Sequence, residues 1–224
     1  MHSPLLIAHR GDRNNFPENS IEGFMSAFSK GADGVEMDVQ FFKGRLIVVH
    51  DYIFDQNKEY PTLQSVLEKI KGKGRIEIEI KAFSKDIIKY LNKILTENKI
   101  DDFELTTSIL PLIAPLRTTF SKARIGAIFN QADFEPWMNE QLIQRKIIEL
   151  MSLMGANVAH LARLTEEQLT QSLVEALHSS NFKVHGHIEK VDMDLQLQIY
   201  DRFMKIGVDQ CTFDDINLLD EVDR

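Results

Sequence analysis

Short runs of apolar and β-branched residues alternate with amphipathic helical patterns along the whole chain of 224 residues. This alternation is typical of a parallel sheet whose strands are joined by crossover helices. A closed (β/α)8 barrel needs eight parallel strands, one fewer than the chain offers. The nine candidate strands are Leu5–His9, Val35–Val39, Leu46–His50, Ile76–Lys81, Leu105–Ser108, Arg124–Phe129, Asn157–Leu161, Lys183–His187 and Gln210–Phe213.

The surplus strand is Leu46–His50. Only eleven residues separate Asp38 from His50, fewer than a helical crossover needs, so we expect an antiparallel hairpin arm after the second barrel strand. A three-residue turn at Lys43–Arg45 would set His50 opposite Asp38. A two-residue turn would pair His50 with Met37 and face it the other way. A role for His50 beside Asp38 therefore predicts the odd-length turn or a bulge.

Apolar stripes at helical spacing follow the strands. One begins at Thr62, directly after Pro61, and the run Thr165–Gln168 is a capping box that opens a later helix. No linker, repeat or low-complexity segment interrupts the pattern. We therefore expect a distorted (β/α)8 barrel, in the α/β class, with residues 1–224 forming one domain.

Composition excludes several classes of protein. The net charge of −8 argues against a nucleic-acid surface, which needs a dense patch of Lys and Arg. Cys211 is the only cysteine, so no internal disulfide can form. The start of the chain resembles no signal peptide, and no apolar run is long enough for a membrane span. We expect a cytoplasmic protein.

The candidate functional residues lie at the carboxyl ends of consecutive strands, where barrels of this kind carry their chemistry. Histidines, carboxylates and cations gather at four of these ends. The four segments are His9-Arg10-Gly11, Glu36-Met37-Asp38, His50-Asp51 and Glu79-Ile80-Lys81.

Three of the carboxylates predict a metal site. Glu36 and Asp38 are two residues apart, so both side chains point to one face of a strand, where they repel unless a cation intervenes. Glu79 from the neighbouring strand completes a set of hard oxygen ligands, which suits Mg²⁺ or Ca²⁺ rather than zinc. The alternative is a solvated carboxylate pair that Arg10 and Lys81 balance.

The two histidines indicate acid–base chemistry. His9 and His50 have ordinary pKa values close to neutrality, and phosphodiester hydrolysis needs one group to take a proton and one to give a proton. An acidic protein that binds an anionic phosphodiester also needs local positive charge, which a cation supplies. A metal-dependent aldolase or decarboxylase barrel would give no reason for two strand-end histidines beside Arg10 and Lys81.

Several ordered motifs between residues 5 and 81 closely resemble the glycerophosphodiester phosphodiesterase family, within the superfamily of phospholipase C-like phosphodiesterase barrels. A weaker echo lies at Lys205–Asp209. The motifs are Ala8–Gly11, Pro17–Ser20, Gly31–Val39, Val48–Asp51, Pro61–Leu63 and Ile78–Lys81.

The resemblance implies hydrolysis of a small-molecule glycerophosphodiester to glycerol 3-phosphate and an alcohol. It implies that His9 and His50 are the catalytic acid–base pair and that Arg10 and Lys81 contact phosphate. It also implies a divalent metal, Mg²⁺ or Ca²⁺, with the ligands Glu36, Asp38 and Glu79.

The sequence departs from the family around the part of the pocket that would hold the alcohol or the glycerol. Only the segment Tyr52–Tyr60 separates Asp51 from Pro61, where the family has a longer insertion. Ile109 stands at a position where the family has an aromatic residue. Late in the chain, Val184–Glu189 and Cys211–Asp215 replace family motifs. His185 and His187 share a strand face there, but no carboxylate or cysteine is in phase with them, so we predict no second metal site.

These departures leave two alternatives open. One is a phosphodiesterase that acts on a lysophospholipid or another phosphodiester. The other is a non-catalytic barrel that binds a phosphate ligand. The metal and histidine residues are intact in both cases, so the chemistry is better defined than the substrate.

Overall fold

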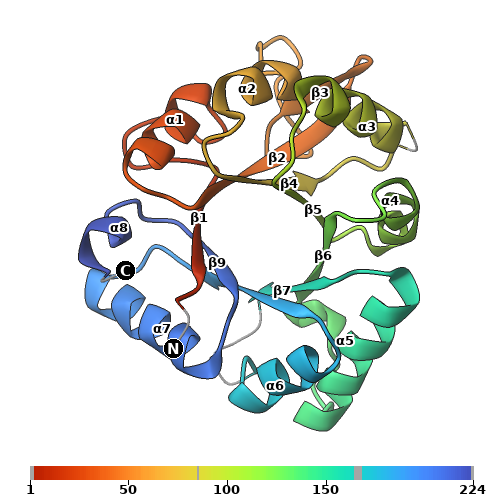
Figure 1. The fold of residues 1–224 in the computed structure, drawn as a ribbon, viewed down its shortest axis with the longest axis vertical. Coiled ribbons are helices and arrows are strands. Elements are labelled where there is room, and N and C mark those ends of the chain that lie inside the picture. Colours follow the sequence, from red (N-terminus) through yellow and green to blue (C-terminus); the bar gives the residue numbers. More distant parts are fainter. Residues whose placement is uncertain (1–2, 85, 164–167, 223–224) are drawn as a thin grey trace.

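Eight parallel strands close into a barrel in the computed structural model, which describes residues 3–84, 86–163 and 168–222. Each strand pairs with its neighbour, and β1 closes the ring by pairing with both β2 and β9 (Figure 1). The predicted (β/α)8 barrel is confirmed. Its strands are β1 (Leu5–His9), β2 (Gly34–Phe42), β4 (Arg75–Ile80), β5 (Phe103–Thr107), β6 (Arg124–Asn130), β7 (Val158–Arg163), β8 (Lys183–Ile188) and β9 (Gln210–Phe213).

Helices surround the barrel, as Figure 1 shows, and the layer between strands and helices is the apolar core. None of the helices in the described ranges is both long and apolar enough to cross a membrane. The α-helices are α1 (Ile21–Ser29), α2 (Leu63–Ile70), α3 (Ile87–Asn98), α4 (Ile113–Thr119), α5 (Glu140–Met154), α6 (Gln171–Ser179), α7 (Met193–Ile206) and α8 (Leu218–Glu221), and the 3₁₀ turns are η1 (Leu110–Leu112) and η2 (Gln131–Asp133).

Side-chain caps fix where several helices begin. The hydroxyl of Thr62 accepts the backbone N–H of Ser65 at the start of α2, as the sequence predicts. Helix α6 is capped in the same way by Thr170. The capping box predicted at residues 165–168 begins in a segment that lies outside the described residues.

The hairpin arm is confirmed, but its predicted register is wrong. Strand β3 (Arg45–Val48) runs antiparallel to β2, with Phe42 opposite Arg45, so the turn holds only two residues. Lys43 and Gly44 both have positive φ angles, 47° and 76°. Such a turn matches the natural twist of paired strands, whereas the three-residue turn needs an added bulge. The twist of the hairpin therefore decides the register.

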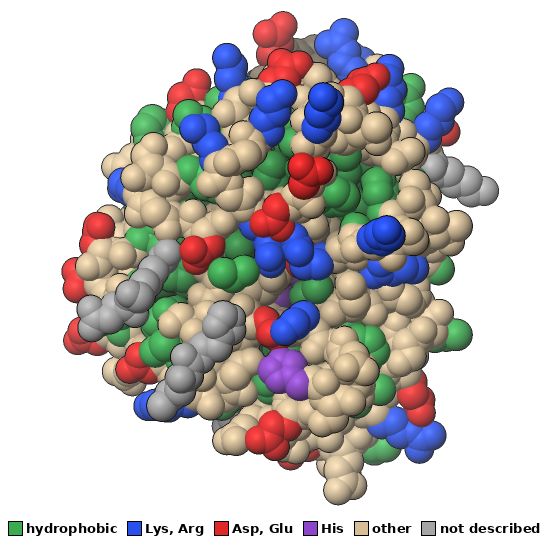
Figure 2. Space-filling view, viewed as in Figure 1, with side chains coloured by type: hydrophobic (Ala, Val, Ile, Leu, Met, Phe, Trp, Pro, Cys, Tyr) green, Lys and Arg blue, Asp and Glu red, His purple; other side chains and the backbone are tan. Residues whose placement is uncertain are grey.

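The surface mixes charges of both signs. On the face drawn in Figure 2, Lys and Arg side chains are interspersed with Asp and Glu. Arg75 and Arg124, at the first residues of β4 and β6, both pair with Asp102. Asp102 thus offsets the charge of these two arginines at that end of the barrel.

Candidate active site

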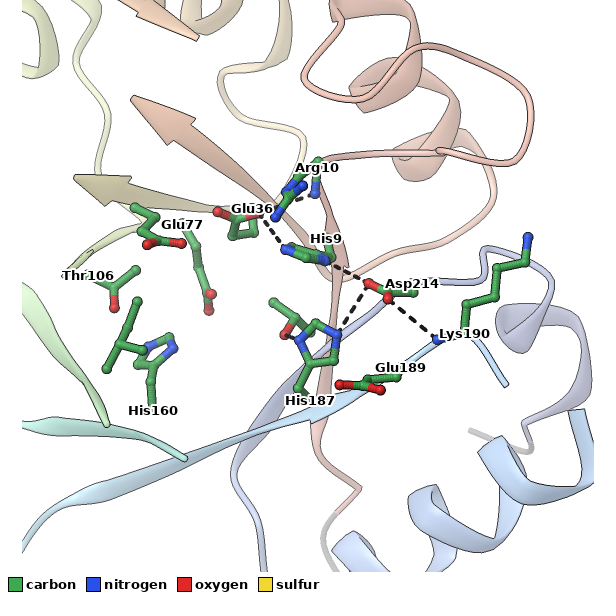
Figure 3. A pocket seen from close by; sticks show the side chains of 13 residues that line it. His9, Arg10, Glu36, Glu77, Thr106, His160, His187, Glu189, Lys190 and Asp214 are labelled. Carbon is green, nitrogen blue, oxygen red and sulfur yellow. Dashed lines mark hydrogen bonds and ion pairs between the residues drawn. The ribbon is translucent and has the colours of Figure 1, made fainter. Parts of the chain in front are cut away.

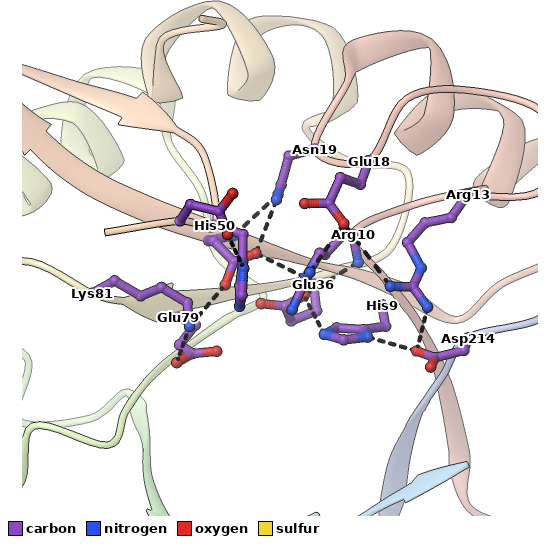
Figure 4. Close-up of polar contacts among 12 residues, drawn as sticks. His9, Arg10, Arg13, Glu18, Asn19, Glu36, His50, Glu79, Lys81 and Asp214 are labelled. Carbon is purple, nitrogen blue, oxygen red and sulfur yellow. Dashed lines mark hydrogen bonds and ion pairs between the residues drawn. The ribbon is translucent and has the colours of Figure 1, made fainter. Parts of the chain in front are cut away.

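The register of the barrel brings the predicted carboxylates together at one mouth. Asp38 on β2 lies beside Glu79 on β4, and Glu36 lies beside His9 on β1. One ligand oxygen from each of Glu36, Asp38 and Glu79 lies within 4.8 Å of the others. Figure 4 shows this cluster with the cations around it.

Two cations are paired with the cluster. Arg10 Nε lies 3.0 Å from Asp38 Oδ2, and Lys81 Nζ lies 3.4 Å from Asp38 Oδ1 and 3.0 Å from Glu79 Oε1. Asn19 holds Asp38 from the other side, because its amide donates to Oδ2 at 2.9 Å. Arg10 and Lys81 therefore balance Asp38 and Glu79, as in the alternative to a metal site, but a third carboxylate remains.

That third carboxylate is Glu36, which is buried. Its Oε1 has no hydrogen-bond partner among the described residues, while Oε2 accepts the backbone N–H of Arg10 at 3.2 Å. Burial raises the pKa of Glu36 well above its ordinary value, and the charges of Asp38 and Glu79 raise it further. A buried oxygen without a partner, among three hard ligands, fits a divalent cation such as Mg²⁺ or Ca²⁺.

His9 is held on the far side of this cluster by Asp214. Asp214 Oδ1 lies 2.6 Å from His9 Nδ1, and because a carboxylate only accepts, Nδ1 carries the proton. His9 Nε2 is then free and lies 3.9 Å from Glu36 Oε2. Burial lowers the pKa of His9 to about 4, although the hydrogen bond to Asp214 opposes this shift.

Asp214 also organises two other side chains. It lies 3.3 Å from His187 Nε2 and 2.9 Å from Arg13 Nη2. Burial raises the pKa of Asp214, but hydrogen bonds from His187 and His9 outweigh this and hold it far below its usual range. The His187 ring packs edge-on against His9, with centroids 4.9 Å apart.

The sequence reasoning gave Asp214 no role, although it directly follows the last barrel strand. The rule that found the other residues, a polar side chain at a strand end, would have found Asp214 too. The sequence analysis considered His187 only together with His185, as part of a second metal site that it did not predict. Its contact with His9 depends on the closure of the barrel between β1 and β9.

His50 is the one predicted residue that the structure leaves outside this contact network. Val49 N–H donates to the carbonyl of Asp38, so Val49 rather than His50 lies across from Asp38. The half-buried His50 ring is hydrogen-bonded through Nδ1 to Asp51 at 2.9 Å. In the view of Figure 4, His50 lies on the Lys81 side of the carboxylates and His9 on the opposite side.

A pocket of about 330 Å³ lies at this mouth. His9, His187 and Asp214 line one side, and Glu77 and His160 line the other (Figure 3). Glu189 and Lys190, which follow β8, also line it. Arg10, Lys190 and two histidines thus bound the pocket at the mouth, and Glu77 and His160 bound it toward the barrel interior.

A second polar cluster fills the barrel below the mouth. The amide of Gln210 donates to Glu77 Oε1 at 2.8 Å and to Glu104 Oε2 at 2.9 Å. His160 donates to Glu104 and stacks on His185, with ring centroids 3.9 Å apart. The carboxylates that the sequence analysis did not find near His185 thus come from β4 and β5.

One ligand atom from each of Glu77, Glu104, His160 and His185 lies within 4.8 Å of the others, but the hydrogen bonds of His185 argue against this residue as a metal ligand. His185 Nε2 accepts the backbone N–H of Thr212 at 2.9 Å, so Nδ1 carries the proton and cannot bind a metal. Burial, and then the charge of Glu104, raises the pKa of Glu77 well above its usual value. The cluster is a buried hydrogen-bond network.

Comparison with known proteins matches the N-terminal part in sequence. Residues 9–56 match the model of the Glycerophosphoryl diester phosphodiesterase family. A glycerophosphodiester phosphodiesterase of Caldanaerobacter subterraneus subsp. tengcongensis is 50% identical over 70 residues, which are 30% of this chain and 29% of that protein. One of Bacillus altitudinis is 53% identical over 47 residues, covering 20% of this chain and 19% of that protein. The aligned segment thus spans less than a third of these relatives.

Solved structures match over nearly the whole chain. The glycerophosphodiester phosphodiesterase of Thermotoga maritima superposes with a TM-score of 0.74 at 20% identity, covering 99% of both chains. An Oleispira antarctica phosphodiesterase, solved with the product sn-glycerol-3-phosphate, gives a TM-score of 0.77 at 16% identity, covering 98% of this chain and 96% of that one. At these identities the likeness shows the fold. In sequence, residues 9–56 thus resemble the glycerophosphodiester phosphodiesterase family, and the chain as a whole shares the barrel fold of the solved structures.

Proposed function

We propose that the protein is a metal-dependent phosphodiesterase that hydrolyses glycerophosphodiesters to glycerol 3-phosphate and an alcohol. The observation that carries this proposal is the buried oxygen of Glu36, which has no hydrogen-bond partner among the described residues and belongs to a three-carboxylate cluster at a mouth lined by His9 and Arg10. The named activity of the curated relatives supports the same reaction.

The three carboxylates would hold the metal. A hard divalent ion bound by Glu36, Asp38 and Glu79 supplies positive charge that offsets the charge on the phosphoryl oxygens. Arg10 and Lys81 now pair with Asp38. With the carboxylates neutralised by an ion, these two cations become available to bind the phosphate.

His9 is suited to take a proton. Its lowered pKa keeps it neutral near pH 7, and Asp214 fixes the tautomer that leaves Nε2 as the basic atom. His50 is the proposed proton donor to the leaving alkoxide. Its Nδ1 is engaged by Asp51, which leaves Nε2 to face the substrate. Catalytic hydrogen bonds often tighten only when substrate binds, so the present separation of His50 from the carboxylates is compatible with this role.

Steady-state hydrolysis of a panel of glycerophosphodiesters tests the proposal. We expect EDTA to abolish activity and Mg²⁺ or Ca²⁺ to restore it. His9→Ala and His50→Ala should each lower kcat/KM by about 10²-fold or more. His178→Ala is the matched control, because His178 is a surface histidine bonded to Asp209.

Each outcome separates one part of the proposal. Activity that persists in EDTA contradicts the metal requirement, and full activity in either histidine variant contradicts the acid–base pair. Saturable binding of glycerophosphodiesters without product, under metal-replete conditions, supports a non-catalytic phosphate-binding barrel instead.

A further inference from the structure

A large apolar groove lies at the same end of the barrel as the candidate active site. Its volume is about 890 Å³, more than twice that of the polar pocket. We call it the apolar groove and define it by the residues that carry the argument: Tyr52, Phe83, Ile88, Ile109, Leu110 and Pro111. Its size falls in the range of pockets that bind small molecules.

The groove is built from the segments that also carry the site. Tyr52 lies two residues after His50, and Phe83 lies two residues after Lys81. Ile109 follows the carboxyl end of β5, the strand next to β4. Two of the groove residues thus follow closely in sequence on His50 and Lys81, the proposed proton donor and a proposed phosphate-binding cation.

Lys81 joins the groove to the site. Its Nζ lies 5.8 Å from the centre of the Tyr52 ring and 3.0 Å from Glu79 Oε1. One cation thus contacts both the carboxylate cluster and an aromatic wall of the groove. A ligand whose phosphate binds Lys81 has its adjoining group at the entrance of the groove.

The groove rim exposes aromatic surface. Tyr52 is 54% exposed and Phe83 is 77% exposed, and their rings lie 6.1 Å apart. Contiguous exposed apolar surface of this kind marks a contact site for a ligand, a membrane or another protein.

We propose that the apolar groove binds a single alkyl or acyl chain of the substrate, so that the preferred substrate class is a phosphodiester with one long chain, such as a lysophospholipid. This inference rests on the proposed function. The charge pattern fits an amphiphile of this kind, with Arg10 and Lys81 at the phosphate end and apolar side chains at the other. If a second copy of the protein occupied the groove instead, the cations at one end of the groove would have no role in the contact.

The reaction on this substrate consumes one water molecule and needs no further reactant. The water oxygen bonds to phosphorus while the P–O bond to the head-group alcohol breaks. One proton leaves the water and one proton is delivered to the alkoxide. The chain-bearing glycerol keeps the phosphate, so the products are a lysophosphatidic acid and the free alcohol.

Kinetics on two matched substrates test the inference. Glycerophosphocholine and lysophosphatidylcholine share the bond to be broken, and only the second has a chain. We expect the parent protein to have the higher kcat/KM for lysophosphatidylcholine, measured below its micelle concentration with product identified by mass spectrometry. Phe83→Ser and Ile109→Ser should each lower the ratio of the two kcat/KM values by about ten-fold, because apolar burial of the chain is lost.

Trp137→Ser is the control variant. Trp137 is 70% exposed, close to the exposure of Phe83, but it lines a different apolar depression on α5. The substrate ratio should not change in this variant. Since Phe83 and Trp137 are both largely exposed, neither substitution removes core packing.

The outcomes distinguish the inference from the proposed function. No hydrolysis of either substrate overturns the proposed function and the inference together. Hydrolysis of glycerophosphocholine with an equal or higher kcat/KM overturns the inference alone, as does a substrate ratio that Phe83→Ser leaves unchanged. A change in sedimentation with Phe83→Ser, without a change in the ratio, assigns the groove to a contact between copies and also overturns it.

Discussion

The carboxylate of Asp214 and the imidazole of His9 meet across the seam where the barrel closes, with Oδ1 2.6 Å from Nδ1. His9 ends β1 and Asp214 directly follows β9, so the partners are 205 positions apart in the chain. The pairing of β1 with β9 brings them together. Asp214 thereby fixes which nitrogen of His9 is free to act, and it is a positioning residue for the proposed reaction.

Asp214→Asn tests this role through the pH profile. His9 acts when neutral, so activity is lost as pH falls through its pKa, which burial lowers to about 4 from 6.5. We expect the acid limb of kcat/KM to lie below pH 6.5. Asp214 raises the pKa of His9, so removing its charge should move the limb lower still and reduce kcat/KM by about ten-fold.

Asp215→Asn is the control, because Asp215 bonds to Asn14 rather than to His9. It should leave the acid limb in place. An acid limb that Asp214→Asn also leaves in place would show that Asp214 only supports the fold.

The barrel could be predicted from the sequence because each strand and helix is encoded by the residues within it. Each strand and helix has its own apolar period, and the short spacing between Asp38 and His50 allows only a hairpin. The register of that hairpin was wrong because it depends on turn twist: Lys43 and Gly44 adopt positive φ angles and close a two-residue turn. Functional reasoning about His50 favoured the other register.

The site divides in the same way. Glu36, Asp38 and Glu79 could be grouped from the sequence, because neighbouring parallel strands end at one edge. The position of Asp214 after the last strand could have been noticed, but its partner His9 could not be predicted, and neither could the partners of Glu77 and Glu104, because these partners lie on strands far away in the chain. Their contacts depend on barrel closure and on which side chains point inward.

Glu36→Gln should stabilise the metal-free protein and weaken metal binding. Because the pKa of Glu36 is raised in the folded protein, ionising this group lowers the free energy of unfolding. The loss of stability begins as pH rises above about 4.5, the ordinary pKa of the group. Near pH 7 the neutral amide removes this repulsion, and we expect Tm to rise by about 3 °C without metal. Mg²⁺ or Ca²⁺ should raise the Tm of the parent more than that of the variant.

Thermal unfolding with and without each metal measures both effects. Glu68→Gln is the control, since Glu68 is an exposed residue of α2 bonded to Gln64. A lower metal-free Tm for Glu36→Gln contradicts a destabilising charge at Glu36. An equal response of both proteins to metal contradicts the assignment of Glu36 as a metal ligand.

Lys43→Asn should stabilise the hairpin arm that carries His50. Lys43 has a φ of 47°, a conformation that Asn adopts more readily than Lys. We expect the free energy of unfolding, measured in urea, to rise by about 0.5 kcal/mol. Gly44→Ala should lower it by about 1 kcal/mol, because no atom lies near the added methyl group and only backbone strain changes. Equal shifts in the same direction would contradict the two-residue turn.

Gln210→Leu should destabilise the protein more than an ordinary core substitution. Gln210 donates to both Glu77 and Glu104, which are fully buried, so its loss leaves two carboxylates without that donor. We expect a loss of about 3 kcal/mol in urea unfolding near pH 7. The pKa of Glu77 is already raised, and losing a donor raises it further, so the loss of stability should be larger at pH 8 than at pH 5. Adding Glu77→Gln in the Gln210→Leu background should recover part of the loss, because it removes one buried charge; a loss that is independent of pH and of Glu77 would assign the effect to packing alone.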